Sequence, residues 1–150
     1  MCTHYIYAFA VLDGASLTIK AFDPEADITL KGYANFVALK AKNPALKMMI
    51  GLGGWNDSHD PNYPSKYSQL VSSSANINNF VTSVVSFIRQ HGFDGLDLDW
   101  EYPSGAADKT GFTSLIIALK TAFQPNGWLL SAAVSAGSFN IDAGNDQIKS

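Results

Sequence analysis

Hydrophobic and polar residues follow two different spacings along this chain. Short apolar or aromatic runs bounded by turn residues predict β-strands at 3–10, at 47–52, within 93–103 and at 128–135. Between these runs, apolar residues recur every three or four positions and predict helices at 29–42, 66–72, 76–91 and 109–123. The pattern predicts four strands separated by helical segments.

The clearest helix is expected at 76–91. Ser74 is the expected N-cap and Gly92 fits the C-cap. Its apolar stripe is interpreted as core and comprises Ile77, Phe80, Val81, Val84, Val85 and Ile88. A short hairpin is a candidate at 16–22, the polar segment 56–65 is expected to be a loop, and a further helix start is a candidate at Asp146.

Alternation of strands with helices implies a parallel sheet in an α/β fold. No linker, low-complexity segment or short repeat interrupts it, so residues 1–150 are expected to form part of one domain with no second domain. Two architectures fit the pattern: a doubly wound open sheet, or part of a (β/α)8 barrel.

The most informative stretch is 93–103, FDGLDLDWEYP. Successive side chains of a strand point to opposite faces, so Asp97, Asp99 and Glu101 share one face, at steps of about 7 Å. Like charges at this spacing repel, and desolvation is expected to raise the pKa of at least one of them. The opposite face carries the apolar residues Leu96, Leu98 and Trp100. A row of carboxylates opposite an apolar face is typical of a strand that lines a site.

The competing interpretation is an edge strand with a charged, solvated face, which natural sheets use against aggregation. The apolar alternates, and the apolar runs elsewhere that resemble buried parallel strands, argue against it. Asp94, which has the opposite parity, is expected to order the start of the strand.

Composition narrows the classes of function. The chain is 47% hydrophobic and 15% charged, with a formal net charge of −3, so neither nucleic acid nor an anionic membrane surface is an expected partner. No apolar run reaches the length of a membrane span, and the first residues show no signal peptide. The single cysteine, Cys2, and three scattered histidines give no ligand spacing, so no metal or other cofactor is expected.

Gly53 and Gly54, with Gly51, superficially resemble a phosphate-binding loop. No Gly, Lys or Ser/Thr follows at the required offset, and a polar segment follows in place of a helix, so nucleotide binding is rejected. Gly53, Gly54, Trp55 and Glu101 instead lie at the carboxyl ends of predicted strands, where (β/α)8 barrels carry their catalytic groups. This placement favours the barrel.

The stretch 93–103 resembles the D-G-x-D-x-D-x-E signature of family 18 glycoside hydrolases, the chitinases and their relatives, and its closing WEYP resembles the animal-type branch. The resemblance runs in register along essentially the whole chain, at 2–10, 47–55, 130–136 and 141–144. One departure is Gly51, where many members carry Ser or Ala, which removes a possible hydroxyl hydrogen bond to the carboxylates.

The resemblance implies a partial (β/α)8 barrel of four parallel strands, which correspond to barrel strands two to five, and therefore an incomplete catalytic domain. It also implies that Cys2 pairs with a cysteine near the family's first strand, as in a secreted parent protein. An isolated half barrel is expected to leave sheet edges unpaired and to favour self-association.

The chemistry implied by the resemblance is substrate-assisted hydrolysis with retention. Glu101 is the implied general acid, and the substrate's own 2-acetamido oxygen is the nucleophile. Asp99 is expected to orient the acetamido group, and Asp97 to tune Asp99 as a coupled pair. The expected partner is chitin or chito-oligosaccharides, because the reaction requires an N-acetylated sugar.

Aromatic side chains suit sugar recognition because pyranose rings stack on flat surfaces. Trp55, Tyr102 and Phe9 are the candidates, together with the backbone at Gly53 and Gly54, whereas Trp100 and Trp128 are interpreted as core. Asn56 begins an N-x-S glycosylation sequon that adjoins the expected cleft.

Two functions follow from these residues: a hydrolase of β-1,4-linked N-acetylglucosamine polymers, or a chitin-binding, lectin-like relative without catalysis. Lectin-like members usually replace the acid, so Glu101 favours the enzyme. A third possibility is a truncated chain that has neither activity.

Overall fold

The computed structural model describes residues 2–136. Over these residues the chain forms one five-stranded sheet with the strand order β2-β1-β3-β4-β5. The strands are β1 His4–Leu12, β2 Ile19–Ala21, β3 Lys47–Gly53, β4 Gly95–Asp99 and β5 Leu129–Ala132. β1, β3, β4 and β5 pair in parallel, as the alternation of strands and helices predicts, and β2 pairs antiparallel with the end of β1. Residues 16–22, a candidate for a short hairpin, supply only the strand β2, which forms a hairpin with the end of β1.

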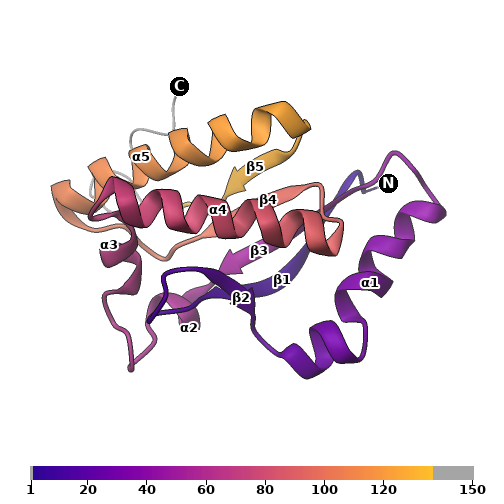
Figure 1. The fold of residues 1–150 in the computed structure, drawn as a ribbon, viewed down its shortest axis with the longest axis horizontal. Helices are drawn as coiled ribbons and strands as arrows, with labels where there is room; N and C mark the ends of the chain where they lie inside the picture. Colours follow the sequence, from indigo (N-terminus) through magenta and orange to yellow (C-terminus); the bar gives the residue numbers. More distant parts are fainter. Residues whose placement is uncertain (1, 137–150) are drawn as a thin grey trace.

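The helices of the described region lie mainly on one face of the sheet. They are η1 Glu25–Thr29, α1 Gly32–Val37, η2 Ala38–Ala41, α2 Trp55–Ser58, α3 Lys66–Val71, α4 Ser74–His91, α5 Gly105–Phe123 and η3 Gln124–Asn126. Figure 1 shows α4 and α5 side by side over β4 and β5, with α3 beside them and α1 at the opposite end of the molecule. This arrangement covers one face of the sheet and leaves the other for the site.

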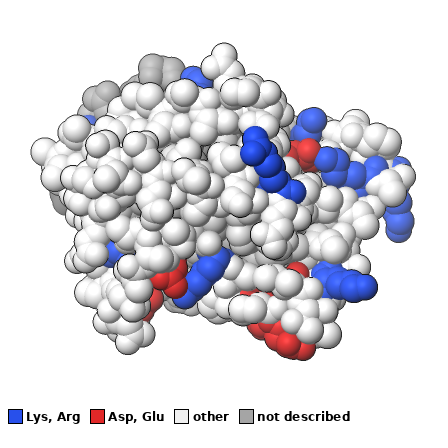
Figure 2. All heavy atoms as spheres, viewed as in Figure 1, with Lys and Arg blue, Asp and Glu red and all other residues white. Residues whose placement is uncertain are grey.

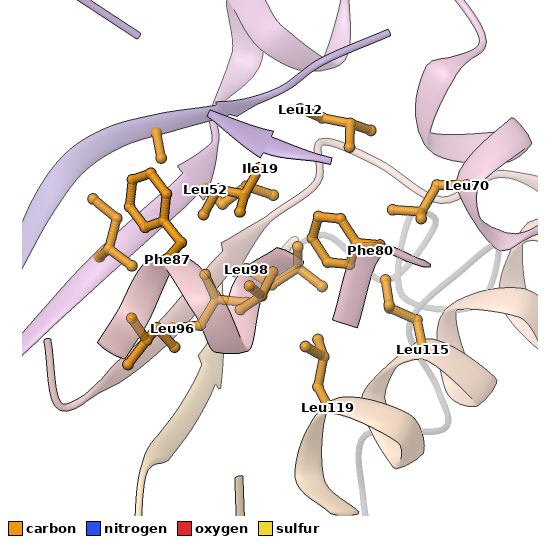
Figure 3. Close-up of a cluster of buried hydrophobic side chains, with 14 of the residues drawn as sticks. Leu12, Ile19, Leu52, Leu70, Phe80, Phe87, Leu96, Leu98, Leu115 and Leu119 are labelled. Atoms are coloured by element: carbon orange, nitrogen blue, oxygen red, sulfur yellow. The ribbon is translucent and has the colours of Figure 1, made fainter. Parts of the chain in front are cut away.

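The core fills the space between the sheet and these helices. Alternate residues of the strands meet apolar residues of α3, α4 and α5 there, and Figure 3 shows their side chains pointing toward one another. Leu52, Leu96, Leu98, Phe80 and Leu115 are each 0% exposed. Truncating such a side chain typically lowers the stability of a protein by about 2–5 kcal/mol. Burial of Leu96 and Leu98 therefore determines which side chains of β4 face the core and which face the site.

The helix predicted at 29–42 is present over 32–41 as α1 and η2, but it starts three residues later than predicted and its last turn is a 3-10 helix. A short π-helical turn, η1, comes first, Lys31 adopts a left-handed conformation (φ 63°), and only then does α1 begin. The cause is the buried carboxylate of Asp27, which accepts hydrogen bonds from the Tyr7 hydroxyl (2.7 Å) and from the backbone amide of Asp23 (3.1 Å). These bonds hold the first turn against β1, so the chain bends before it continues as α1.

Smaller boundary differences have local causes. Ser73, one residue before the predicted Ser74, is the N-cap of α4, and its hydroxyl accepts the backbone amide of Asn76 at 3.2 Å. Gly92 ends α4 with φ 77°, as predicted. α5 begins at Gly105, ahead of the predicted residue 109, because the Asp108 carboxylate accepts the backbone amide of Ser104 at 3.1 Å and closes the first turn. The candidate helix start at Asp146 lies outside the described residues.

Charged side chains are sparse on the face shown in Figure 2, where most of the surface over α4 and α5 is uncharged. In the described part of the chain, no helix combines the length and the apolarity needed to cross a membrane.

Candidate functional site

The carboxylate-bearing strand lies inside the sheet. β4 is paired on one side with β3 and on the other with β5, so the edge-strand interpretation is wrong. Leu96 and Leu98 point into the core, and Asp97 and Asp99 therefore point to the opposite face, where both are half-buried. β4 ends at Asp99, so Glu101 lies just beyond the strand and not within it as predicted.

Two glycines on β3 lie beside these carboxylates. Gly51 is the register partner of Asp97, and Gly53 is the partner of Asp99. Gly53 has φ +117°, and the backbone amide of Gly54 donates to the carbonyl oxygen of Asp99 at 2.8 Å. A Cβ atom on Gly51 would lie 3.1 Å from the Phe9 ring and 3.2 Å from Ile6, and one on Gly53 would lie 2.2 Å from the Asp99 carbonyl oxygen, so both positions are too tightly packed for a side chain.

Asp99 has a perturbed environment. Burial raises the pKa of Asp99, and the neighbouring charges of Glu101 and then Asp97 raise it further. This agrees with the expectation that desolvation raises the pKa of at least one of these carboxylates. Asp97 is tied to the next strand, since the Ser131 hydroxyl on β5 donates to its Oδ1 atom at 2.5 Å. Sequence reasoning did not identify Ser131.

Glu101 and Tyr102 form a unit at the end of β4. A hydrogen bond from the Tyr102 hydroxyl to the Glu101 carboxylate raises the pKa of Tyr102. The backbone amide of Glu101 donates to the Ser58 hydroxyl at 2.9 Å. The proposed acid is therefore held from two directions, by an aromatic hydroxyl at its carboxylate and by a serine at its backbone.

A buried ion pair lies beneath the segment that was predicted to be a loop. Lys66 is 2% exposed, and its Nζ atom lies 2.6 Å from Oδ1 of Asp57 and 3.3 Å from Oδ2 of Asp60. The second oxygen of Asp57 accepts the Tyr67 hydroxyl at 2.6 Å and the backbone amide of Leu12 at 3.1 Å. These bonds hold residues 55–58 in the short helix α2, which corrects the start of the loop predicted at 56–65, whereas residues 59–65 form neither helix nor strand, as predicted.

Four of the predicted binding residues share one cavity. Phe9, Gly53, Gly54 and Trp55 line a space of about 580 Å³ between the end of β1 and the segment after β3. Trp55 is 57% exposed and stacks on His59 with the ring centroids 3.9 Å apart. Tyr102 does not line this cavity and lies instead at Glu101. The candidate site therefore has two parts, an aromatic cavity and the row of carboxylates.

Asp94 has the structural role expected of it. Its carboxylate accepts the Lys40 ammonium at 2.6 Å and the backbone amide of Met48 at 2.8 Å, which joins the start of β4 to α1–η2 and β3. Trp100 is buried against Tyr67 and Phe112, as predicted for a core residue. Trp128 is half-buried at the margin of the core, where its ring packs against Phe123 and the Arg89 guanidinium lies 5.7 Å from its centroid.

No group of three or more His, Cys, Asp or Glu residues with the geometry of a metal site occurs among residues 2–136.

The chain was compared with known protein families, curated proteins and solved structures. The family described as "Glycosyl hydrolases family 18" matches residues 1–150. The chain belongs to glycosyl hydrolase family 18. Among curated relatives, this family 18 chain is 46% identical over 153 residues to "Probable chitinase 10" of Drosophila melanogaster and 40% identical over 152 residues to "Endochitinase" of Manduca sexta.

Solved structures of the family have the same fold. Catalytic domain 2 of the Ostrinia furnacalis Group II chitinase, solved as a mutant in complex with penta-N-acetylchitooctaose, (NAG)5, is 46% identical and has a TM-score of 0.88. The chitinase-like agglutinin of Robinia pseudoacacia is 32% identical, with a TM-score of 0.73. The predicted α/β fold, four parallel strands of a partial (β/α)8 barrel, is thereby confirmed.

The family 18 chain spans only part of these proteins. It covers 6% of the Drosophila relative, 26% of the Manduca relative and 38% of the Ostrinia catalytic domain, whereas each match covers about 95% of this chain.

Proposed function

We propose that this chain carries the acid-bearing part of a chitinase-type glycoside hydrolase that cleaves β-1,4-linked N-acetylglucosamine polymers. The observation that carries the proposal is the position of Asp97, Asp99 and Glu101 at the carboxyl end of a central strand, where the pKa of Asp99 is raised. Membership of family 18 supports it. The Ostrinia domain in complex with (NAG)5 supports the substrate class.

Each carboxylate has a distinct task in the proposed reaction. Glu101 protonates the glycosidic oxygen while the substrate's 2-acetamido oxygen attacks the anomeric carbon, so that the intermediate is an oxazolinium ion. Asp99 orients the acetamido group and stabilises the positive charge that develops on it. Asp97 shares the titration of Asp99 and is itself held by the Ser131 hydroxyl. Water then opens the intermediate with overall retention.

The aromatic side chains are proposed to hold the sugar chain. Trp55 offers an exposed ring and Phe9 a half-buried one beside it in the same cavity, and Tyr102 offers a third ring next to the acid. Gly53 and Gly54 let the polymer approach the backbone between these rings. Stacking of C–H faces on such rings suits an extended polysaccharide.

The test is hydrolysis of a chromogenic chitotriose derivative by this chain, together with Glu101→Gln and a deacetylated, chitosan-like substrate. Turnover that both changes abolish supports Glu101 as the acid and the acetamido group as the nucleophile. A folded chain with no turnover contradicts enzymatic activity of the chain itself. Binding of chitotriose without turnover would favour the lectin-like alternative.

Two further features of the proposed parent protein follow. Cys2 is exposed and forms no disulfide within the described residues, and the resemblance pairs it with a cysteine beyond this chain, which is typical of an oxidising, extracellular compartment. We therefore propose that the protein is secreted. We also propose that the chain self-associates, because Ile6, on the sheet face opposite the helices, is 46% exposed. Sedimentation velocity tests this, and a monomer at high concentration contradicts it.

A further inference from the structure

The short helix α2 connects the two parts of the candidate site. It has four residues, Trp55–Ser58, and follows the turn at Gly54, where φ is +85°. Its first residue, Trp55, presents its ring to the aromatic cavity. Its last residue, Ser58, accepts the backbone amide of Glu101 at 2.9 Å. One turn of helix thus separates the sugar-facing ring from the contact that holds the acid.

The contact at Ser58 continues the sheet where β3 has left it. The Gly54 amide makes the last backbone bond between these segments, to the Asp99 carbonyl at 2.8 Å, and β4 ends there. Two residues later, β3 has ended, and the backbone amide of Glu101 donates to the Ser58 hydroxyl in place of a β3 carbonyl oxygen. The Ser58 side chain therefore sets where the backbone of Glu101 lies after the strand ends.

The Asp57 carboxylate makes α2 a fixed support. Lys66 and Tyr67 on α3 hold it at 2.6 Å each, and the Leu12 amide at the end of β1 holds it at 3.1 Å. Asp57 is 8% exposed. Because α2 is bonded to both β1 and α3, a side chain at its end can define a position for Glu101.

We propose that Ser58 is a positioning residue that places Glu101 relative to the Trp55 ring, with Asp57 as the anchor of the helix that carries both. The proposal rests on the proposed function, in which Glu101 is the acid and Trp55 holds the sugar. Ser58 itself touches neither the reacting bond nor the carboxylate. A displacement of an acid by about 1 Å can cost about 100-fold in rate, so a single hydroxyl at this place has a large effect on catalysis.

The kinetic test compares Ser58→Ala with Ser83→Ala. Ser83 is a matched control because its hydroxyl also accepts a backbone amide, that of Ile19 at 3.2 Å, and it is also half-buried but lies on α4. With the chitotriose derivative, Ser58→Ala should lower kcat about 10–100-fold with KM changed less than about threefold, and Ser58→Thr should restore most of kcat. Ser83→Ala should leave kcat unchanged. Equal kcat in Ser58→Ala and the unaltered chain, or equal losses in both alanine variants, would overturn the proposal.

A second readout does not depend on turnover. The hydrogen bond from Tyr102 to Glu101 raises the pKa of Tyr102, so an NMR titration of the Tyr102 ring reports where the Glu101 carboxylate lies. Ser58→Ala should lower the pKa of Tyr102 toward that in Glu101→Gln, which removes the carboxylate charge, whereas Ser83→Ala should not. An unchanged titration in Ser58→Ala overturns the positioning role. Absence of turnover in the unaltered chain would count against the proposed function alone, and the titration would still decide the role of Ser58.

Discussion

Gly53 and Asp99 face each other across β3 and β4 so closely that a Cβ atom on Gly53 would lie 2.2 Å from the carbonyl oxygen of Asp99. That oxygen is already bonded to the Gly54 amide, so it cannot move away without breaking the last bond between the two strands. A side chain at Gly53 would also have to adopt φ +117°, which L-residues avoid.

We therefore expect Gly53→Ala to destabilise the fold by more than about 3 kcal/mol in urea unfolding. Gly127→Ala is the matched control, because Gly127 also has positive φ (65°) but no atom lies within 4 Å of its Cβ position. The control should cost about 1 kcal/mol, the backbone effect alone. Equal losses in the two variants would mean that the contact with Asp99 is unimportant.

Asp99→Asn should stabilise the fold at neutral pH. The pKa of Asp99 is raised in the folded state, so the charged carboxylate destabilises the fold. This destabilisation is absent when pH lies below the unfolded-state pKa and is complete when pH lies above the folded-state pKa. The gain should reach about 1 kcal/mol at pH 7, because the carboxyl is still partly solvated, and should vanish as pH falls below the unfolded value. Thermal unfolding between pH 3 and pH 8 measures it.

Asp13→Asn should change the stability in the opposite direction in the same experiment. Lys20, and then the backbone amide of Ser16, hold the pKa of Asp13 well below its usual range. Its contribution to stability is present above the unfolded pKa and is lost as pH falls through the folded one. Asp13→Asn should therefore destabilise the fold at pH 7. Stabilisation by both substitutions would point to a general effect of lower negative charge.

Two ion pairs of nearly equal length should differ in their contribution to stability, because only one of them is buried. The Lys66–Asp57 pair (2.6 Å) has side chains 2% and 6% exposed, and the Lys20–Asp13 pair (2.7 Å) has side chains 55% and 25% exposed. Lys66→Met leaves the Asp57 carboxylate buried without its cation and should cost about 3–5 kcal/mol. Lys20→Met should cost less than about 1 kcal/mol. Urea unfolding of both variants measures the difference, and similar losses would show that water reaches the inner pair.

The parts of this fold that the sequence predicted are those with a regular spacing. Apolar residues at Leu96 and Leu98 alternate with acids, so the two faces of β4 could be derived from period two, and its pairing with parallel neighbours from the alternation of strands and helices. The helix α4 followed from its apolar stripe and its closing Gly92. The row of carboxylates belonged to the same stretch, and its position opposite the core follows from the same alternation.

The parts that it did not predict depend on contacts between distant residues. Ser58 meets Glu101 across 43 positions, and Asp57 meets Leu12 across 45, so nothing near either residue indicates the partner. Both acids of 56–65, Asp57 and Asp60, pair with Lys66 on α3, and this buried pairing, which the polar sequence does not reveal, is what hid α2. The late start of the helix predicted at 29–42 also depends on a distant contact, the bond of Asp27 to Tyr7 on β1.

The parallel register of the sheet has a consequence for the order in which the chain folds. The pairs Ile6–Met49, Met49–Gly95 and Gly95–Leu129 each join residues more than thirty positions apart. Each pairing closes a long loop, so the sheet forms slowly, whereas α4 and α5 need only neighbouring residues. In stopped-flow refolding, the helical circular dichroism signal should therefore recover before the fluorescence of buried Trp100. The carboxylates of β4 then gain their neighbours on β3 and β5, such as Gly53 and Ser131, only late in folding.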